Sequence, residues 1–199
     1  MMRPTVESDA PQILSLAASF FTAAEVACVQ ELLELYLHKP GQRDYSFLCY
    51  EDGGQVVGFA CYGPTPLTES TYSLYWICVQ RPYRHHGIGG ALLAEVESRI
   101  ARQGGRLLVA ETSSTPQYAP ARRFYAQHGF QEAARIRDFY AIADDLIIYS
   151  KQEAASPAQP DRAKAARRQV QPALGTLART RRRGRRVSPH RSSPQSAGV

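Results

Sequence analysis

The chain has 199 residues, and its 24 Lys and Arg residues exceed its 18 Asp and Glu residues, which gives a formal net charge of +6. No run of 18 apolar residues occurs, and no basic segment followed by an apolar one opens the chain. The sequence therefore predicts neither a membrane-spanning helix nor a signal peptide, and the cytoplasm is the expected location. Four cysteines without metal-ligand spacing are expected to be buried free thiols: Cys28, Cys49, Cys61 and Cys78.

The first half of the chain reads as a strand, two helices and a hairpin. Apolar residues recur at helical spacing in 10–20, and Thr22 and Glu25 form a capping box that starts a second helix. Glu51-Asp-Gly-Gly54 separates two apolar runs, as the turn of a hairpin does. The expected elements are a strand at 3–6, helices at 10–20 and from Thr22 to near Pro40, and hairpin strands at 45–50 and 55–62.

The second half reads as a strand–helix–strand unit followed by a short helix and two strands. An apolar stripe on a helix at 87–103, between strands at 72–79 and 106–111, predicts a right-handed parallel crossover. Gly129 is well placed to end a short helical stretch in the left-handed conformation. The last strands are expected at 131–136 and 146–150.

The charge of the chain is concentrated at its C-terminal end. Residues 152–199 hold 11 basic and 2 acidic residues, a net charge of +9, whereas residues 1–151 hold 13 basic and 16 acidic residues, a net charge of −3. Hydrophobic periodicity stops at Gln152, and such a segment buries too little apolar surface to offset its ordering entropy. We expect a folded domain at 1–151 and a basic, disordered tail at 152–199.

A basic, glycine-rich loop follows the strand at 72–79. It reads Arg84-x-x-Gly87-x-Gly89-Gly90 and opens a helix. The N–H groups at a helix start lack partners and attract anions, and glycines let a ligand approach the backbone. A P-loop is excluded because no Gly-Lys-Ser or Gly-Lys-Thr occurs. A dinucleotide fingerprint fits poorly because Leu92 stands at the third glycine position. The loop therefore predicts a pyrophosphate site of another kind.

Two motifs together resemble the GCN5-related N-acetyltransferase (GNAT) superfamily. The first is the Arg84-x-x-Gly87-x-Gly89 loop, and the second is Ala121-Arg-Arg-Phe124-Tyr125-Ala-Gln-His-Gly129-Phe130. The resemblance covers roughly the first three quarters of the chain. It implies a mixed α/β (α+β) acyl-CoA N-acyltransferase fold: a central twisted, mostly antiparallel sheet of six to seven strands, one parallel βαβ crossover and about four helices.

The resemblance also implies acetyl-CoA as acyl donor and assigns residues to it. Backbone groups of the strand before the loop would hold the pantetheine arm, and the loop would hold the pyrophosphate. Many family members have an asparagine where this chain has Tyr118, so Tyr118 is expected to offer a hydroxyl or to stack instead. No third ligand joins the two loop histidines at metal spacing, so no metal is expected. The implied cofactor-binding residues are Ile77, Cys78, Val79, Arg84, His85, His86, Gly87, Ile88, Gly89, Gly90, Tyr118 and Arg122.

Three residues are candidates for proton transfer. In the family, the tyrosine that matches Tyr125 lies near the thioester sulfur, and an unperturbed phenol with a pKa of ~10 keeps its proton at neutral pH. Glu111 ends a parallel strand, where open α/β sheets bind ligands, and is the first candidate for the base. Glu69, in the loop before the cofactor strand, is the second. Either carboxylate could instead bind a cationic acceptor, or water could relay the proton.

The predicted function is an N-acetyltransferase that acts on a primary amine of a small molecule, peptide or protein by direct attack in a ternary complex. The segment from Arg137 to Tyr149 resembles ribosomal-protein alanine acetyltransferases, so a protein N-terminus is an alternative acceptor. A further alternative is a CoA-binding protein whose Arg-rich tail contacts nucleic acid through phosphates. We expect a monomer or homodimer with no membrane partner.

Overall fold

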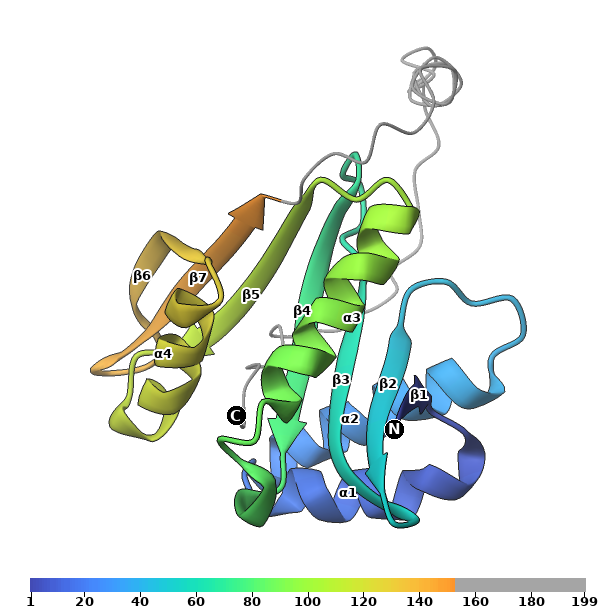
Figure 1. The fold of residues 1–199 in the computed structure, drawn as a ribbon. Helices are drawn as coiled ribbons and strands as arrows, with labels where there is room; N and C mark the ends of the chain where they lie inside the picture. Colours follow the sequence, from blue (N-terminus) through green and yellow to red (C-terminus); the bar gives the residue numbers. More distant parts are fainter. Residues whose placement is uncertain (153–199) are drawn as a thin grey trace, which may run out of the picture. The chain divides into compact units, whose positions relative to one another are not determined.

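A seven-stranded mixed sheet with helices on both faces forms the part of the chain that the computed structural model describes, residues 1–152 (Figure 1). The strands are β1 (Met2–Pro4), β2 (Ser46–Asp52), β3 (Gln55–Pro64), β4 (Thr71–Val79), β5 (Leu107–Ser113), β6 (Gln131–Ala141) and β7 (Asp144–Gln152). The α-helices are α1 (Ala10–Ala18), α2 (Ala23–His38), α3 (Ile88–Arg102) and α4 (Ala119–Gln127), and the short 3₁₀ turns are η1 (Glu7–Asp9), η2 (Arg81–Tyr83) and η3 (Pro116–Tyr118).

The strand order is β1-β2-β3-β4-β5-β7-β6, and β4–β5 is the parallel pair among otherwise antiparallel neighbours. The parallel pair arises because α3 carries the chain back across one face of the sheet between β4 and β5. Among the antiparallel pairs, β2–β3, β3–β4 and β6–β7 are consecutive strands, whereas α1 and α2 lie between β1 and β2, and α4 and β6 lie between β5 and β7. This architecture confirms the predicted fold class, with four α-helices in the described residues.

Local signals in the sequence set the ends of several elements. The capping box at the start of α2 is confirmed: the Glu25 N–H donates to Thr22 Oγ1 over 3.3 Å, and the Thr22 N–H donates to Glu25 Oε2 over 2.8 Å. The β2–β3 hairpin turns at Gly53 and Gly54, both with positive φ, as a two-residue turn requires. Gly129, with φ of +84°, follows the end of α4 as predicted.

Two buried layers pack against opposite faces of the sheet. One consists of α3 and α4 over residues such as Leu74, Ile77 and Leu108, and the other of α1 and α2 over residues such as Phe59 and Trp76 (Figure 1). Successive side chains of the central strands point to opposite faces, and they pack into both layers because both faces are covered by helices.

Three of the four cysteines are buried as predicted. Cys49, Cys61 and Cys78 lie in strands beneath the α1–α2 layer. Cys28 is only partly buried, which corrects the prediction for this residue: the fully buried positions of α2 are Val29 and Leu33, so Cys28 lies beside that stripe.

A β-bulge in β4 separates it from β5. Cys61 pairs with Trp76 and Tyr62 pairs with Leu74, which leaves Tyr75 as an extra residue. The ladder between β4 and β5 ends at this point, with the pair Leu74 and Ala110, although β4 continues to Val79. A bulge bends a strand and increases its twist, and Figure 1 shows the two strands diverging beyond their paired ends. The sheet therefore opens between β4 and β5 toward the loop that follows Val79.

The predicted tail at 152–199 lies outside the described residues except for Gln152, the last residue of β7. The nucleic-acid contact suggested for its arginines lies outside them too. Across residues 1–152, none of the helices is both long and apolar enough to span a bilayer.

Candidate active site

The loop between β4 and α3 ends at a glycine that starts the helix. Gly87 has φ of +80° and is the N-cap of α3, where no side chain caps the helix. The first N–H groups of α3 therefore have no side-chain acceptor at the N-cap, and the helix start carries partial positive charge. His85 also has a positive φ of 63°, an uncommon conformation for a residue with a Cβ. Two of the three residues before α3, His85 and Gly87, thus have left-handed backbone conformations.

A cavity of about 310 Å³, which we call the loop cavity, lies between the start of α3 and α4. At Gly90, an added Cβ would lie 2.9 Å from His128 Nε2, so a larger residue there would require the His128 ring to move. The residues that line the loop cavity are Val79, Arg84, His85, Gly87, Gly89, Gly90, Pro120, Arg123, Phe124, Gln127 and His128.

The structure brings most of the predicted loop residues to this cavity, but not all. His85 lines it and His86 does not, while Ile88 is buried in the core beneath the start of α3. Arg122 turns away: its guanidinium donates to the carbonyl oxygens of Ser113 (2.6 Å) and Thr115 (2.8 Å). Its cofactor role stays a prediction, and the structure gives it a role in fixing the connection between β5 and α4.

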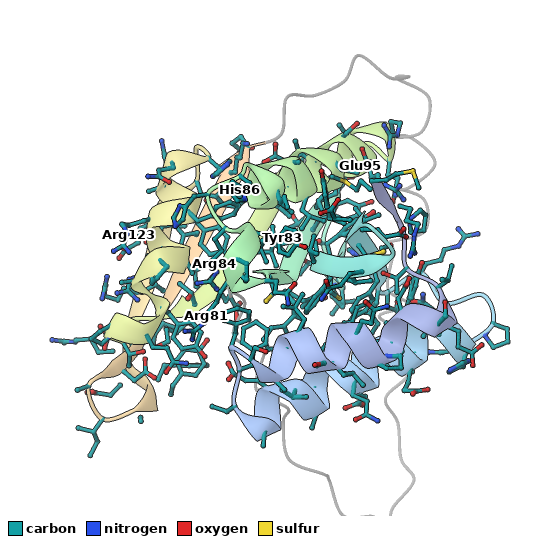
Figure 2. All side chains as sticks on the ribbon, turned by 60° about the horizontal axis from the view of Figure 1, so that its bottom comes forward. Arg81, Tyr83, Arg84, His86, Glu95 and Arg123 are labelled. Atoms are coloured by element: carbon teal, nitrogen blue, oxygen red, sulfur yellow. The ribbon has the colours of Figure 1, made fainter. Side chains whose placement is uncertain are left out.

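Arg123 is one of the cavity residues that were not predicted from the sequence; Phe20 and Arg81 of the second cavity described below are others. Arg123 lies on α4 (Figure 2) and shares the loop cavity with Pro120 and Gln127. These three residues follow the i, i+3, i+7 spacing of one helix face. That spacing was present in the sequence and could have distinguished Arg123 from its neighbour Arg122.

A second cavity of about 390 Å³, which we call the junction cavity, adjoins the loop cavity, since Arg84 and Pro120 line both. It lies where the turn between α1 and α2 faces the start of α4 and the loop after β4. Its lining residues are Ala18, Ser19, Phe20, Phe21, Thr22, Arg81, Arg84, Gln117, Tyr118, Pro120 and Ala121.

Arg84 crosses between the two cavities and contacts the end of β4. Its Nε donates to the carbonyl oxygen of Val79 over 3.2 Å, and its guanidinium carbon lies 4.4 Å from the centre of the Phe20 ring. Burial lowers the pKa of Arg84, and the charge of Arg81 acts in the same direction. Both arginines lie between α4 and the pair α1 and α2 (Figure 2). The cavities therefore meet at the end of β4, beside the opening in the sheet.

Residues 43–132 match the model of the acetyltransferase (GNAT) domain. A solved protein of Desulfovibrio desulfuricans, assigned to the GNAT family of acetyltransferases, is 43% identical, with 77% of this chain and 99% of that chain covered and a TM-score of 0.75. The chain belongs to the GNAT family. No curated protein matches it.

More distant GNAT structures share the fold. The ribosomal-protein-S18-alanine N-acetyltransferase of Escherichia coli is 21% identical, with 81% and 97% of the two chains covered and a TM-score of 0.63. The aminoglycoside 6'-N-acetyltransferase of Enterococcus faecium is 16% identical, with 79% and 99% covered and a TM-score of 0.64. The two enzymes differ in the acceptors they are named for, so the shared fold does not select an acceptor.

Tyr118, at the start of α4, ties this helix to α2. Its hydroxyl donates to Glu25 Oε1 over 2.8 Å, and its side chain is buried, with 6% of the residue exposed. Burial raises the pKa of Tyr118, and the hydrogen bond to Glu25 raises it further. Gln117 makes a second, longer contact, from Nε2 to the Phe20 carbonyl oxygen (3.5 Å). Tyr118 thus borders the junction cavity and holds its two walls together.

Glu111 lies at the point where the sheet opens. It directly follows Ala110, the last β5 residue paired with β4, and it pairs with Ile148 of β7. Leu108 and Ala110 pack in the α3–α4 layer, so by strand alternation Glu111 faces the α1–α2 side. Burial raises the pKa of Glu111, and its charge contributes to the raised pKa of Tyr140, which is due mainly to burial. The carboxyl is therefore half-buried beside a phenol on the α1–α2 face.

Tyr125 and Glu69 lie apart from Glu111. Tyr125 is fully buried on α4, with its ring 5.3 Å from that of Phe130 and 5.5 Å from that of Tyr149. It is thus on the opposite face of the sheet from Glu111, and its role as acid stays a prediction. Glu69 is exposed in the loop before β4. The nine residues of β4 span about 30 Å at ~3.3 Å each, so Glu69 lies far from the end of β4. The linings of the two cavities include none of the three candidates, Glu69, Glu111 and Tyr125.

Proposed function

We propose that the protein is an N-acetyltransferase that transfers the acetyl group of acetyl-CoA to a primary amine by direct attack in a ternary complex. The observation that carries the proposal is the meeting of two adjoining cavities at the end of β4, where the bulge at Tyr75 opens the sheet. The loop cavity would take the donor and the junction cavity the acceptor. Two cavities that adjoin at one strand end suit a reaction in which both substrates are bound together.

The residues of the loop cavity fit the pyrophosphate of such a donor. The N-terminus of α3 offers N–H donors, Gly87 leaves open space around its Cβ position, and Gly90 leaves room for the His128 side chain. Arg84 and Arg123 supply positive charge at the rim. The backbone of residues 77–79, past the end of the β4–β5 ladder, would bind the pantetheine arm.

The donor supplies the acetyl group as a thioester, and the chain's own residues would handle the protons. Glu111 would accept a proton from the acceptor's ammonium group, because a carboxyl whose pKa is raised is better matched to this task near neutral pH. Backbone N–H groups past the bulge would stabilise the carbonyl oxygen as negative charge develops. Tyr125, on the α3–α4 side, would hold the proton needed by the departing sulfur.

A peptide or protein N-terminus is the second candidate acceptor. The segment that resembles ribosomal-protein alanine acetyltransferases forms the β6–β7 hairpin, whose large apolar side chains at Ile136, Phe139 and Ile142 are exposed. Exposed apolar side chains gathered on one hairpin suit contact with an extended peptide more than with a small molecule.

Thermal unfolding of the full chain with acetyl-CoA tests the proposal. A ligand that binds only the folded state stabilises it by about 2.7 kcal/mol at a hundredfold excess over Kd. We expect a clear rise in Tm for the parent and none for Gly87→Glu, which places a side chain and negative charge at the start of α3.

Gly54→Glu is the matched control. Gly54 has φ of +82°, close to the +80° of Gly87, and equally open space around its Cβ position, but it lies in the β2–β3 turn. It should keep the full ligand-induced rise. The proposal fails if acetyl-CoA leaves the parent unchanged, or if both variants lose the rise equally.

A further inference from the structure

Two arginines share one aromatic ring at the junction cavity. The guanidinium carbons of Arg81 and Arg84 lie 5.6 Å and 4.4 Å from the centre of the Phe20 ring. The ion pairs formed within residues 1–152 include neither arginine. Two like charges held beside the same ring repel one another, and that repulsion is relieved when an anion binds between them.

The rest of the cavity wall offers no negative charge to them. Its polar side chains are the neutral groups of Ser19, Thr22, Gln117 and Tyr118. Glu25, which lies outside this lining, accepts hydrogen bonds from Tyr118 and from Thr22. The lining of the junction cavity therefore carries two arginine charges and no acid, although residues 1–151 as a whole carry a net charge of −3.

Arg81 belongs to the junction cavity and not to the proposed donor site. Arg84 lines both cavities, whereas Arg81 lines only the junction cavity. The phosphates assigned to the start of α3 would therefore meet Arg84 and Arg123 but not Arg81. The volume of about 390 Å³ is within the range of pockets that hold small molecules.

We propose that the junction cavity binds an acceptor that carries a carboxylate as well as its amine, and that Arg81 binds this carboxylate, while Arg84, which lines both cavities, lies between the carboxylate and the donor's phosphates. The proposal rests on the acetyltransferase function proposed above and specifies its acceptor class. Guanidinium groups bind carboxylates through two parallel N–H donors, and cation–π contacts with Phe20 hold both arginines at the cavity. The amine of such an acceptor would lie toward the end of β4, which Arg84 contacts through Val79.

The test compares free amino acids with the matching amino-acid amides, which keep the amine and lose the carboxylate. Binding of each to the full chain is measured by calorimetry without acetyl-CoA, and kcat/KM is measured by CoA release with acetyl-CoA. In the parent, at least one free amino acid is expected to bind and react at least tenfold better than its amide. In Arg81→Gln this ratio is expected to fall to about one, while the Tm rise caused by acetyl-CoA remains.

Arg43→Gln removes the same charge from an exposed residue before β2 and should keep the parent's ratio. The proposal is overturned if no free amino acid is preferred over its amide in binding. It is also overturned if Arg81→Gln loses the acetyl-CoA response, because Arg81 would then serve the donor's phosphates. If the parent binds a free amino acid but shows neither turnover nor a Tm rise with acetyl-CoA, the acetyltransferase function alone is rejected.

Discussion

The hydrogen bond between Tyr118 and Glu25 is expected to stabilise the fold measurably, because it joins segments 93 residues apart. One carboxylate oxygen of Glu25 accepts from the Tyr118 hydroxyl, and the other accepts from the N–H and the hydroxyl of Thr22, each over 2.8 Å. Glu25 thus caps α2 and anchors the start of α4 at the same time. Removing either partner tests the two roles separately.

The expected costs follow from what each substitution leaves behind. Tyr118→Phe removes one charge-assisted hydrogen bond from a partly buried acceptor, about 1–2 kcal/mol. Glu25→Ala removes the capping box, about 1 kcal/mol, and leaves the buried Tyr118 hydroxyl without its acceptor, a further ~1–3 kcal/mol. The double variant no longer contains the orphaned hydroxyl, so its cost should be smaller than the sum of the single costs by about 1–2 kcal/mol.

Urea unfolding of the full chain, monitored by far-UV circular dichroism and fitted with one m-value for all variants, measures this coupling. Thr22→Ala is the control: it weakens the cap but leaves the Tyr118–Glu25 bond, so its cost should add to that of Tyr118→Phe within about 0.5 kcal/mol. Costs of Glu25→Ala and Tyr118→Phe that add within the same margin would refute the assigned role of this bond.

Three further outcomes are expected. Asp9→Asn should lower the unfolding free energy by about 3 kcal/mol in urea, because buried Asp9 pairs with both terminal nitrogens of Arg3. Arg3 lowers the pKa of Asp9, so the parent should lose this stability as the pH falls below about 4, and Asp9→Asn should lack that dependence. Gly63→Ala should yield no soluble folded protein on expression, because its Cβ would lie 1.8 Å from the Asp44 carbonyl oxygen. Burial raises the pKa of Tyr75 to about 12, so unfolding in urea should become easier between pH ~10 and pH 12, and less so in Tyr75→Phe.

The fold could be predicted where short-range signals define it. The capping box at Thr22, the glycine pair at Gly53 and the left-handed Gly129 each act within a few residues of their own position. The parallel crossover followed from the lengths of the strand, helix and strand around α3. These features need no knowledge of distant contacts, and the structure confirms them.

The site was predicted less completely because its geometry depends on long-range contacts and on which face of a strand or helix each residue occupies. The bulge at Tyr75 is hidden, since β4 is apolar on both faces and shows no break in its pattern. The bond between Tyr118 and Glu25 joins elements distant in sequence. Arg122 and Arg123 differ by about 100° around α4, so an error of one position exchanges a structural arginine for a cavity one.

The bulge in β4 has little effect on which side chains of this strand face each layer of the core. Tyr75 and Trp76 both pack toward the α1–α2 layer, while Leu74 and Ile77 both pack toward the α3 layer. A chain lacking Tyr75 would therefore keep every other side chain of β4 on its present face, because alternation would run unbroken from Leu74 through Trp76 to Ile77. The bulge at Tyr75 is therefore compatible with the packing of both layers, and its removal would leave every other β4 side chain in the layer that it now occupies.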